Sequence, residues 1–404
     1  MGHPFPPPIP GVKARWTLDP DVVFLNHGSF GACPAAVLER QAGWRARMER
    51  QPVLFLGREV EPLLDAARFA LAPFLGARPD DLAFQVNASH AVSAVLRALP
   101  FEPGEEILVS DHGYNACNNA ARDVAERAGA ALVVANVPFP TASEDQVVDA
   151  FLERVSTRTK LAVVDHVTSQ TGLVWPIARL VRTLQQAGVD VLVDGAHAPG
   201  MVPLDLDDLG AAYYAGNLHK WVCAPKGAAF LHVRADRRER IRPLSVSHGL
   251  NSPRTDRDRF RLLFDWTGTC DPTPWLCVPD ALRFLGDLVP GGVIALRDRL
   301  RATTLAARDL LCAALGVAPP SPVSMIGALA AIPLPAGPPA SPEPPLYLHP
   351  MQVRLWERRR IEVPFMATPD GAGWSVRISG APYNVEDDYV RLAGALIAEG
   401  AAAS

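Results

Sequence analysis

Two ionisable side chains stand near the middle of the chain, where apolar residues give way to polar ones. An apolar run over 191–193 ends at Asp194, and Lys220 follows within the segment 216–221. A lysine amine can form a Schiff base with the aldehyde of pyridoxal 5'-phosphate (PLP), and a carboxylate can keep the pyridine nitrogen protonated, so that the ring accepts electrons. Each residue alone would more often be structural, because Asp-Gly after a strand forms turns and many lysines lie at the surface. Together they predict a PLP site with Lys220 as its catalytic residue.

Alternating strands and helices would have to position this pair. The hydrophobic pattern predicts strands over 82–86, 106–110, 131–137, 161–165, 191–194 and 227–233, and helices over 44–50, 60–74, 90–99, 118–128, 145–155 and 177–187. Such alternation is typical of a doubly wound α/β fold with a mostly parallel sheet and flanking helices. Ligands of these sheets bind at the carboxyl ends of the strands, where Asp194 stands.

Three regions are expected along the chain. Residues 1–20 form a proline-rich, loose arm, residues 21–260 a large PLP-binding α/β domain, and residues 261–404 a smaller α+β domain. In the last of these, the pattern predicts helices over 273–315 and 385–398 and a strand over 374–378. The proline-rich segment 333–350 cannot be a helix or a central strand, so it is expected to be a surface loop or an interdomain spacer.

Composition limits the possible partners and compartments. The 404 residues are 49% hydrophobic, which is enough for a large core and two domains. The net charge of -4 and the lack of a long basic block argue against a nucleic acid or an anionic membrane as the main partner. Without a signal peptide or a membrane-spanning apolar stretch, the protein is expected in the cytoplasm. The six cysteines are scattered without a C-x-x-C pair, so they predict reduced thiols and no metal site.

Several ordered motifs extend this pattern over about residues 24–388. They are FLNHGSFG at 24–31, NASHA at 87–91, DHGYN at 111–115, DHVTSQTG at 165–172, DGAH at 194–197, HKW at 219–221, GT at 268–269 and VRIS at 376–379. With these motifs, the chain resembles PLP enzymes of fold type I in the class V aminotransferase superfamily, a group that includes cysteine desulfurases. Within that group it is most similar to the isopenicillin N epimerase-like branch.

The phosphate of PLP is expected at the start of the helix after residue 86. Asn87, Ala88 and Ser89 mark a change from strand to helix, where free backbone N–H groups and the helix dipole suit an anion. An ordinary N-cap by Asn87 or Ser89 is the structural alternative, and both can hold at once. The family resemblance adds Asn217 and His219 as contacts on the phosphate side.

The resemblance also implies contacts to the cofactor ring. His112 corresponds to a histidine that stacks on the ring in class V enzymes, and Tyr114 is the alternative stacking residue or a substrate contact. His197 is expected near the phenolic oxygen. Ser169 stands where cysteine desulfurases usually have asparagine, which puts its contact with the cofactor in question.

An amino-acid substrate needs a cation for its carboxylate, and the guanidinium fork of arginine offers two donors in fixed geometry. Arg377 matches the family's carboxylate-binding arginine, although a strand arginine could instead pair with a surface acid. The resemblance implies that Asn26 joins Arg377 in binding the substrate. It also implies that Thr269 reaches the phosphate of a neighbouring subunit, hence a homodimer with shared sites.

The cofactor alone leaves the reaction open, because loss of the α-proton can lead to epimerisation, transamination or β-elimination. A cysteine desulfurase is disfavoured, since no cysteine follows Cys312 and Cys312 lies in an apolar helical stretch. We expect an epimerase-like enzyme, with a C–S lyase of the hercynylcysteine sulfoxide lyase type or an aminotransferase as alternatives. An epimerase needs a second base, for which Tyr114 and the nearby histidines are candidates.

Two interpretations from other classes are weaker. A catalytically silent scaffold would be expected to lack Lys220, Asp194 or Arg377, and all three are present. A nucleotide-binding oxidoreductase would show G-x-G-x-x-G after an early strand, and the sequence has none there.

Overall fold

A seven-stranded sheet forms the centre of the computed structural model, which describes residues 2–335 and 348–401. Its strands are β2 (Leu82–Gln85), β3 (Glu106–Ser110), β4 (Ala131–Ala135), β5 (Thr159–Asp165), β6 (Asp190–Asp194), β7 (Tyr213–Asn217) and β8 (Ala229–Val233). They lie in the order β2-β8-β7-β6-β5-β3-β4. β8 is antiparallel to both of its neighbours, and the other pairs are parallel. The predicted α/β fold with a mostly parallel sheet is confirmed.

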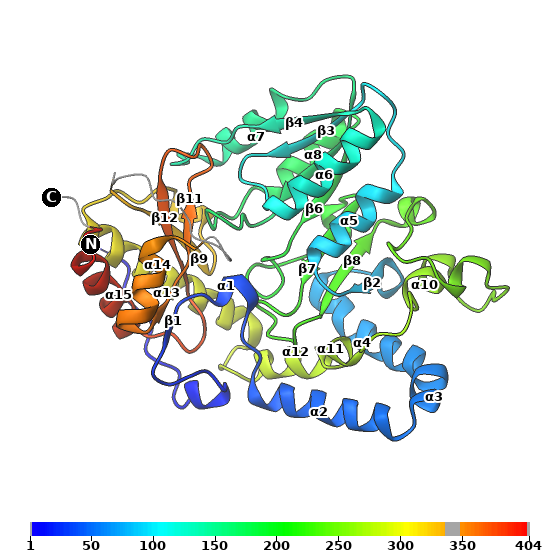
Figure 1. Ribbon diagram of the computed structural model, residues 1–404, viewed down its shortest axis with the longest axis horizontal. Coiled ribbons are helices and arrows are strands. Elements are labelled where there is room, and N and C mark those ends of the chain that lie inside the picture. Colours follow the sequence, from blue (N-terminus) through cyan, green and yellow to red (C-terminus); the bar gives the residue numbers. More distant parts are fainter. Residues whose placement is uncertain (1, 336–347, 402–404) are drawn as a thin grey trace.

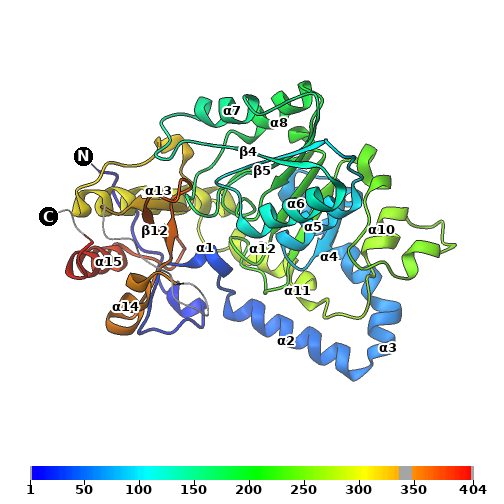
Figure 2. The same ribbon diagram turned by 45° about the horizontal axis from the view of Figure 1, so that its top comes forward.

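Helices cover both faces of this sheet (Figures 1 and 2). One buried core joins the sheet to α4 (Val60–Leu75), α7 (Glu144–Leu152) and α8 (Ile177–Gln186). The core on the other face includes α5 (Ala88–Ala98), α6 (Asn115–Ala128) and α10 (Arg259–Phe264). Successive residues of a strand point to opposite faces, so Val191 and Val193 of β6 join the first core and Leu192 joins the second. Burial on both faces is why the central strands are continuous apolar runs.

A second, smaller group of elements contains the carboxyl-terminal sheet. It comprises β9 (Leu329–Pro333), β11 (Phe365–Ala367) and β12 (Trp374–Ser379), packed with α13 (Gly292–Leu315), α14 (Pro350–Arg359) and α15 (Glu386–Ala398). The three strands are antiparallel in the order β11-β12-β9. β1 (Val23–Phe24) pairs in parallel with β10 (Ile361–Glu362), so this short amino-terminal strand lies with the carboxyl-terminal elements. Residues 336–347 of the proline-rich segment lie outside the described residues.

The remaining elements are short or peripheral. They are the helices α1 (His27–Phe30), α2 (Ala35–Arg50), α3 (Pro52–Leu54), α9 (Leu206–Leu209), α11 (Thr273–Leu276) and α12 (Val278–Gly286), the π-helical turn Phe55–Glu59, and the 3-10 turns Lys13–Arg15, Pro79–Asp81, Ala235–Arg240, His248–Asn251 and Val323–Met325. α1 lies between the two groups of elements in both ribbon views (Figures 1 and 2). This position places residues 26–31 beside the active site described below.

The single helix predicted over 273–315 is three helices. Gly291 and Gly292 separate α12 from α13 with φ of +90° and +67°, which glycine adopts without a Cβ clash. α11 and α12 pack against α2 and α4 and share the core of the large sheet. This core continues into the first turns of α13 through Leu296 and Leu300, and from Leu305 onward α13 belongs to the carboxyl-terminal core.

The amino-terminal arm is also less loose than its proline content predicts. Val12 and Trp16 are buried, with 4% and 5% of their surface exposed. Trp16 Nε1 donates to the carbonyl of Ala32, and its ring makes edge contacts with Phe284 and Tyr383. Burial of these apolar side chains fixes the arm against the folded chain, an effect that depends on distant residues and is therefore hidden in the local sequence.

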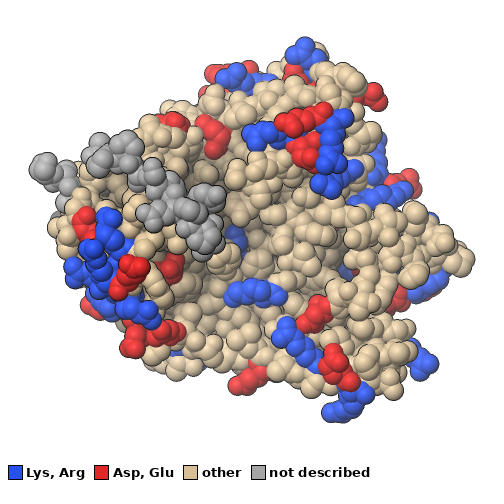
Figure 3. Space-filling view, in the orientation of Figure 1, with Lys and Arg blue, Asp and Glu red and all other residues tan. Residues whose placement is uncertain are grey.

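Charges are interleaved on the face of the molecule shown in Figure 3, where acidic and basic side chains lie mainly toward the rim and the centre is largely uncharged. This face therefore presents no extended basic surface. Among the described residues, no helix is both long enough and apolar enough to cross a membrane.

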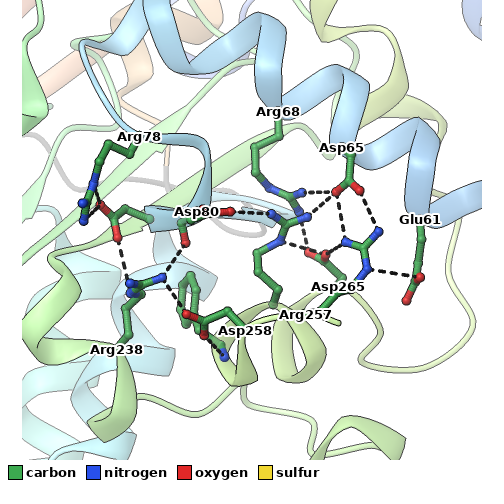
Figure 4. Close-up of polar contacts among 12 residues, drawn as sticks. Glu61, Asp65, Arg68, Arg78, Asp80, Arg238, Arg257, Asp258 and Asp265 are labelled. Atoms are coloured by element: carbon green, nitrogen blue, oxygen red, sulfur yellow. Dashed lines mark hydrogen bonds and ion pairs between the residues drawn. The ribbon is translucent and has the colours of Figure 1, made fainter. Parts of the chain in front are cut away.

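An arginine–carboxylate network joins α4 to α10 and the residues around it (Figure 4). The side chain of Arg68 is 1% exposed and pairs with Asp65 and Asp265. Arg257 and Arg261 pair with the same two carboxylates. Because Arg68 is removed from water, these carboxylates must compensate its charge. The network thereby anchors the start of the loop that carries Thr269.

Asp265→Ala should destabilise the protein, because it leaves Arg68 buried with one carboxylate fewer. We expect the free energy of unfolding to fall by about 3 kcal/mol, the usual cost of breaking a buried ion pair, as measured by urea unfolding. The matched control is Asp256→Ala, which removes a surface carboxylate paired with Arg254 and should leave the midpoint unchanged. Equal losses in both variants would contradict the role assigned to burial.

Candidate active site

Two carboxyl groups end neighbouring strands of the large sheet. Asp165 closes β5 and Asp194 closes β6, and the two residues are direct partners in the parallel register. They are 4% and 3% exposed. Parallel strands bring their carboxyl ends to one edge of the sheet, where α/β proteins bind ligands. Asp194 thus stands at the carboxyl end of β6, and Asp165 stands beside it.

Two donors point at the carboxylate of Asp194. The Cys117 thiol lies 3.1 Å from Oδ2, and the backbone N–H of Ala196 donates to Oδ1 over 3.0 Å. Burial and the nearby Asp194 raise the pKa of Cys117 well above its usual value, so the thiol keeps its proton and donates. Burial, together with the charge of Asp194, also raises the pKa of Asp165 well above its usual value. Because its pKa is raised, Asp165 keeps its proton, and the buried pair does not carry two negative charges.

Lys220 follows β7 and is buried, with its Nζ 3.1 Å from His197 Nε2. Burial, followed by the charge of Arg377, lowers the pKa of Lys220 to about 7, and Asp194 partly opposes this shift. Burial also lowers the pKa of His197 well below its usual value. The neutral imidazole therefore accepts a hydrogen bond from the lysine amine. Near neutral pH, a large share of Lys220 is uncharged and nucleophilic.

A cavity of about 350 Å³ opens at these side chains. Ten of the residues predicted for the site line it: Asn87, Ala88, Ser89, Tyr114, Ser169, Asp194, His197, Asn217, His219 and Lys220. The lining also includes Asp165 and the exposed apolar side chains of Phe30 and Val86. The fold thus brings these residues from six separate segments of the sequence to one cavity.

The start of α5 forms one wall of the cavity. Asn87 caps the helix by accepting from the backbone N–H of His90 over 2.8 Å, and Asn217 Oδ1 accepts from the N–H of Ala88 over 2.8 Å. The N–H of Ser89 makes no hydrogen bond within residues 2–335 and 348–401. The helix therefore combines both predicted roles: Asn87 is an N-cap, and a backbone donor of the first turn stays free for an anion.

Arg377 of β12 has 1% of its surface exposed and does not itself line the cavity, but it contacts Ser29 and Ser169, which do. Nη1 donates to the carbonyl of Ser169, and Nη2 donates to Ser29 Oγ over 3.0 Å and Asn26 Oδ1 over 3.4 Å. Burial lowers the pKa of Arg377 to about 10, which leaves it charged at neutral pH. No carboxylate of the described chain pairs with it, and its Nε is unpartnered there. The alternative of an arginine paired with a surface acid is thus not seen, and Asn26 lies beside Arg377 as predicted.

Four predicted contacts are absent from the cavity lining: Asn26 and Arg377, described above, and His112 and Thr269. His112 is fully buried, with Nδ1 2.9 Å from Thr171 Oγ1 and Nε2 3.0 Å from the carbonyl of Val137, and it is absent from the cavity lining. Tyr114 does line the cavity, and the stacking role of His112 or Tyr114 stays a prediction. Thr269 is exposed and lies outside the cavity of its own chain.

The prediction from the sequence gave no role to Asp165, Ser29 or Phe30, although all three stand in the motifs that carry the resemblance. For Asp165 a signal was available: it ends a predicted strand in the same way as Asp194. For Ser29 and Phe30 the signal was weak, because a turn-rich segment does not reveal which distant surface it covers.

The match to the family model "Aminotransferase class-V" spans residues 34–260, and the chain belongs to this family of PLP-dependent enzymes. Isopenicillin N epimerase of Amycolatopsis lactamdurans is 39% identical over 95% of this chain and 96% of the relative. A probable chloroplastic L-cysteine desulfhydrase of Arabidopsis thaliana is 31% identical over 94% and 83%. Hercynylcysteine sulfoxide lyase of Schizosaccharomyces pombe is 25% identical over 95% of each chain.

A solved structure shows the same fold. A variant of C-DES with glycine covalently linked to its PLP cofactor superimposes with a TM-score of 0.78 over 95% of this chain and 98% of that chain, at 20% identity. Together with the family match, this likeness identifies fold type I of the PLP-dependent enzymes.

The residues of the cavity fit PLP. A buried amine with a pKa near 7 can bond to the aldehyde, and Asp194 with its two donors can hold the pyridine nitrogen. The free N–H of Ser89, the side chain of His219 and the start of α5 suit the phosphate. His197 Nδ1 has no partner in the described residues, so it retains hydrogen-bonding capacity. When bound, PLP supplies an electron-accepting ring that stabilises negative charge at the substrate α-carbon.

Asp165→Asn tests the buried carboxyl pair. Because the folded-state pKa of Asp165 is raised, the folded protein holds a proton that the unfolded chain releases above about pH 4. The contribution of Asp165 to stability therefore falls as pH rises above that point. In protein freed of PLP, the variant should gain stability over the parent, and the gain should be larger at pH 8 than at pH 5 by urea unfolding. The exposed control Asp149→Asn should show a difference independent of pH, and the same result for Asp165→Asn would refute the assignment.

Proposed function

We propose that this PLP-dependent enzyme inverts the α-carbon of an amino-acid substrate, in the manner of isopenicillin N epimerase. The observation that carries the proposal is Arg377, a buried cation without a carboxylate partner in the described chain, beside the segment that contacts Lys220. A buried charge is costly unless it is paired, so this site is prepared for an anionic ligand. An amino-acid carboxylate fits the guanidinium fork.

Lys220 would move the α-proton on one side of the substrate. Its lowered pKa leaves a large uncharged fraction at neutral pH, and His197 accepts from the amine and so orients it. Burial and the neighbouring Cys117 and Asp194 raise the pKa of Tyr114, so its phenol stays protonated and can donate. Tyr114 is therefore our candidate for the second proton carrier that inversion requires. His197 and His219, by contrast, are neutral and already bonded to Lys220 and to the carbonyl of Ala228.

A C–S lyase is the second candidate, because two of the similar proteins are named for reactions of this class, a cysteine desulfhydrase and a hercynylcysteine sulfoxide lyase. Transfer of sulfur to an enzyme cysteine is disfavoured here. None of the residues lining the cavity of the described chain is a cysteine, and Cys312 is buried in α13, as its apolar surroundings predict.

The test is to incubate the purified enzyme with L- and D-amino acids and cysteine S-conjugates, followed by chiral and oxo-acid analysis. We expect both enantiomers to form from either one, without release of oxo acid. Pyruvate formed from S-conjugates would instead identify a lyase, and conversion of amino acid to oxo acid with amination of the cofactor would identify an aminotransferase.

Two variants separate the roles within this assay. Lys220→Ala should lose the visible absorbance of bound PLP and reduce turnover by at least about a hundredfold. Arg377→Lys keeps the charge but loses the fork, and kcat/KM should fall by about tenfold to a hundredfold, mainly through KM. Arg377→Lys with unchanged kinetics would contradict carboxylate binding by Arg377.

We also propose that the enzyme is a homodimer in which Thr269 contacts the phosphate site of the partner subunit. Thr269 is exposed at the end of a loop anchored by Asp265, and Phe30 and Val86 expose 72% and 41% of their surface at the cavity. Light scattering should give twice the 43.5 kDa chain mass, and Thr269→Val should weaken PLP binding by about tenfold without changing that mass. A monomer with full PLP affinity would rule this arrangement out.

A further inference from the structure

His27 links the catalytic lysine to the carboxyl-terminal elements. It is fully buried at the start of α1, where Nε2 lies 3.0 Å from the main-chain carbonyl of Lys220 and Nδ1 lies 2.7 Å from Tyr383 Oη. The histidine ring also contacts Trp221, the residue after the lysine, with ring centroids 4.8 Å apart. His27 does not line the cavity, so any effect on catalysis would act through Lys220.

The direction of each hydrogen bond can be deduced. A carbonyl oxygen only accepts, so Nε2 must carry the hydrogen that binds Lys220. Burial lowers the pKa of His27 to about 4, so the ring is neutral and Nδ1 accepts. Burial raises the pKa of Tyr383 well above its usual value, so the phenol keeps its hydrogen and donates to Nδ1. Tyr383 therefore fixes the tautomer of His27 that can hold the lysine main chain.

The residues around His27 reach the other functional cation. Asn26 and Ser29, on either side of it, both accept from Arg377. The N–H of Gly28 donates to Ser379 Oγ over 3.0 Å, two residues after Arg377 on β12. One short segment thus touches the carboxylate-binding candidate and the main chain of Lys220.

Gly31 shows how closely this segment approaches the lysine. Its φ is +70°, and a Cβ at this position would fall 2.0 Å from the carbonyl oxygen of His219 and 2.9 Å from Cα of Lys220. The backbones are therefore in direct contact, with no room for a side chain between them. A displacement of residues 26–31 would move the lysine main chain with it.

We propose that His27 is a positioning residue: held by Tyr383, it fixes the main chain of Lys220 and, through residues 26–31, sets the lysine relative to Arg377. The fixed main chain keeps the amine in its buried place, surrounded by His197, His219, Arg377, Asp194 and Cys117. The link to Arg377 deepens the proposed function and rests on it. The hydrogen bond from His27 to the main chain of Lys220 does not rest on the proposed function, because it concerns only the lysine and PLP.

The experiment adds PLP to PLP-free enzyme and measures the rate at which the visible absorbance band appears. The rate is measured at a series of pH values between 5.5 and 10. Only the uncharged amine attacks the aldehyde, so the pH at half-maximal rate reports the pKa of Lys220. In the parent enzyme the midpoint should be near pH 7. His27→Ala should release the main chain and let water reach the amine. The midpoint should then rise by about one unit, so that reconstitution at pH 6 is about tenfold slower.

Three further variants make the result specific. His27→Gln can still donate to a carbonyl and accept from a phenol, so it should restore the parent midpoint to within a few tenths of a unit. Tyr383→Phe removes only the hydroxyl that fixes the tautomer and should shift the midpoint in the same direction as His27→Ala, but by less. The matched control is Tyr389→Phe, another fully buried tyrosine, whose hydroxyl donates to the carbonyl of Ser379. It should lower stability but leave the midpoint unchanged.

A His27→Ala or Tyr383→Phe enzyme with the parent midpoint would overturn the positioning role, and so would an equal shift in Tyr389→Phe. If His27→Ala does not fold, the near-isosteric Tyr383→Phe still decides the question. The assay contains no amino acid, so its outcome is independent of which reaction the enzyme catalyses. The link to Arg377 is tested separately: His27→Ala should lower kcat for an amino-acid substrate, whereas Arg377→Lys should act mainly on KM.

Discussion

Burial of positive charge without a matching carboxylate is the constraint on which the active site depends. Lys220 and Arg377 are both removed from water, and burial lowers the pKa of each; the charge of Arg377 lowers the pKa of Lys220 further. The surrounding main chain and neutral side chains supply hydrogen bonds without neutralising these charges. An amine that is half uncharged near neutral pH and a guanidinium free for an anion are consequences of the same dry environment. The large cores on both faces of the sheet provide the stability that tolerates this cost.

The two cations come from different parts of the fold, so their spacing is a tertiary property. Lys220 follows a strand of the large sheet, and Arg377 lies in the antiparallel carboxyl-terminal sheet. Residues 26–31 lie between them and contact both, with Gly31 against the lysine backbone and Ser29 against the guanidinium. A segment from the amino-terminal end of the chain thus joins the two halves of the site. Strand β1, which directly precedes this segment, pairs with β10 and not with the large sheet.

The hydrophobic pattern predicted the elements well where a strand is buried on both faces and where a capping residue marks the start of a helix. The strands ending at Asp165 and Asp194, and the helix capped by Asn87, follow from apolar runs and a capping residue. Predictions failed where distant contacts decide the outcome. The arm around Trp16 looked loose because its partners, Phe284 and Tyr383, are far away in sequence. For His112, the structure adds the partners of its two ring nitrogens, Thr171 and Val137, which come from other segments of the chain.

The sequence by itself determined the chemistry available to this protein: a lysine and an acid at strand ends, a capped helix start for a phosphate, and an arginine for a carboxylate. These properties depend on residue type and local spacing, which can be read directly from the sequence motifs. Only the tertiary structure decided that Asp165 stands beside Asp194, that Arg377 lacks a carboxylate in the described chain, and that His27 holds the carbonyl of Lys220. Burial and charge pairing depend on which segments meet in space, because solvent exclusion and Coulomb interactions act over ångströms and not over sequence distance.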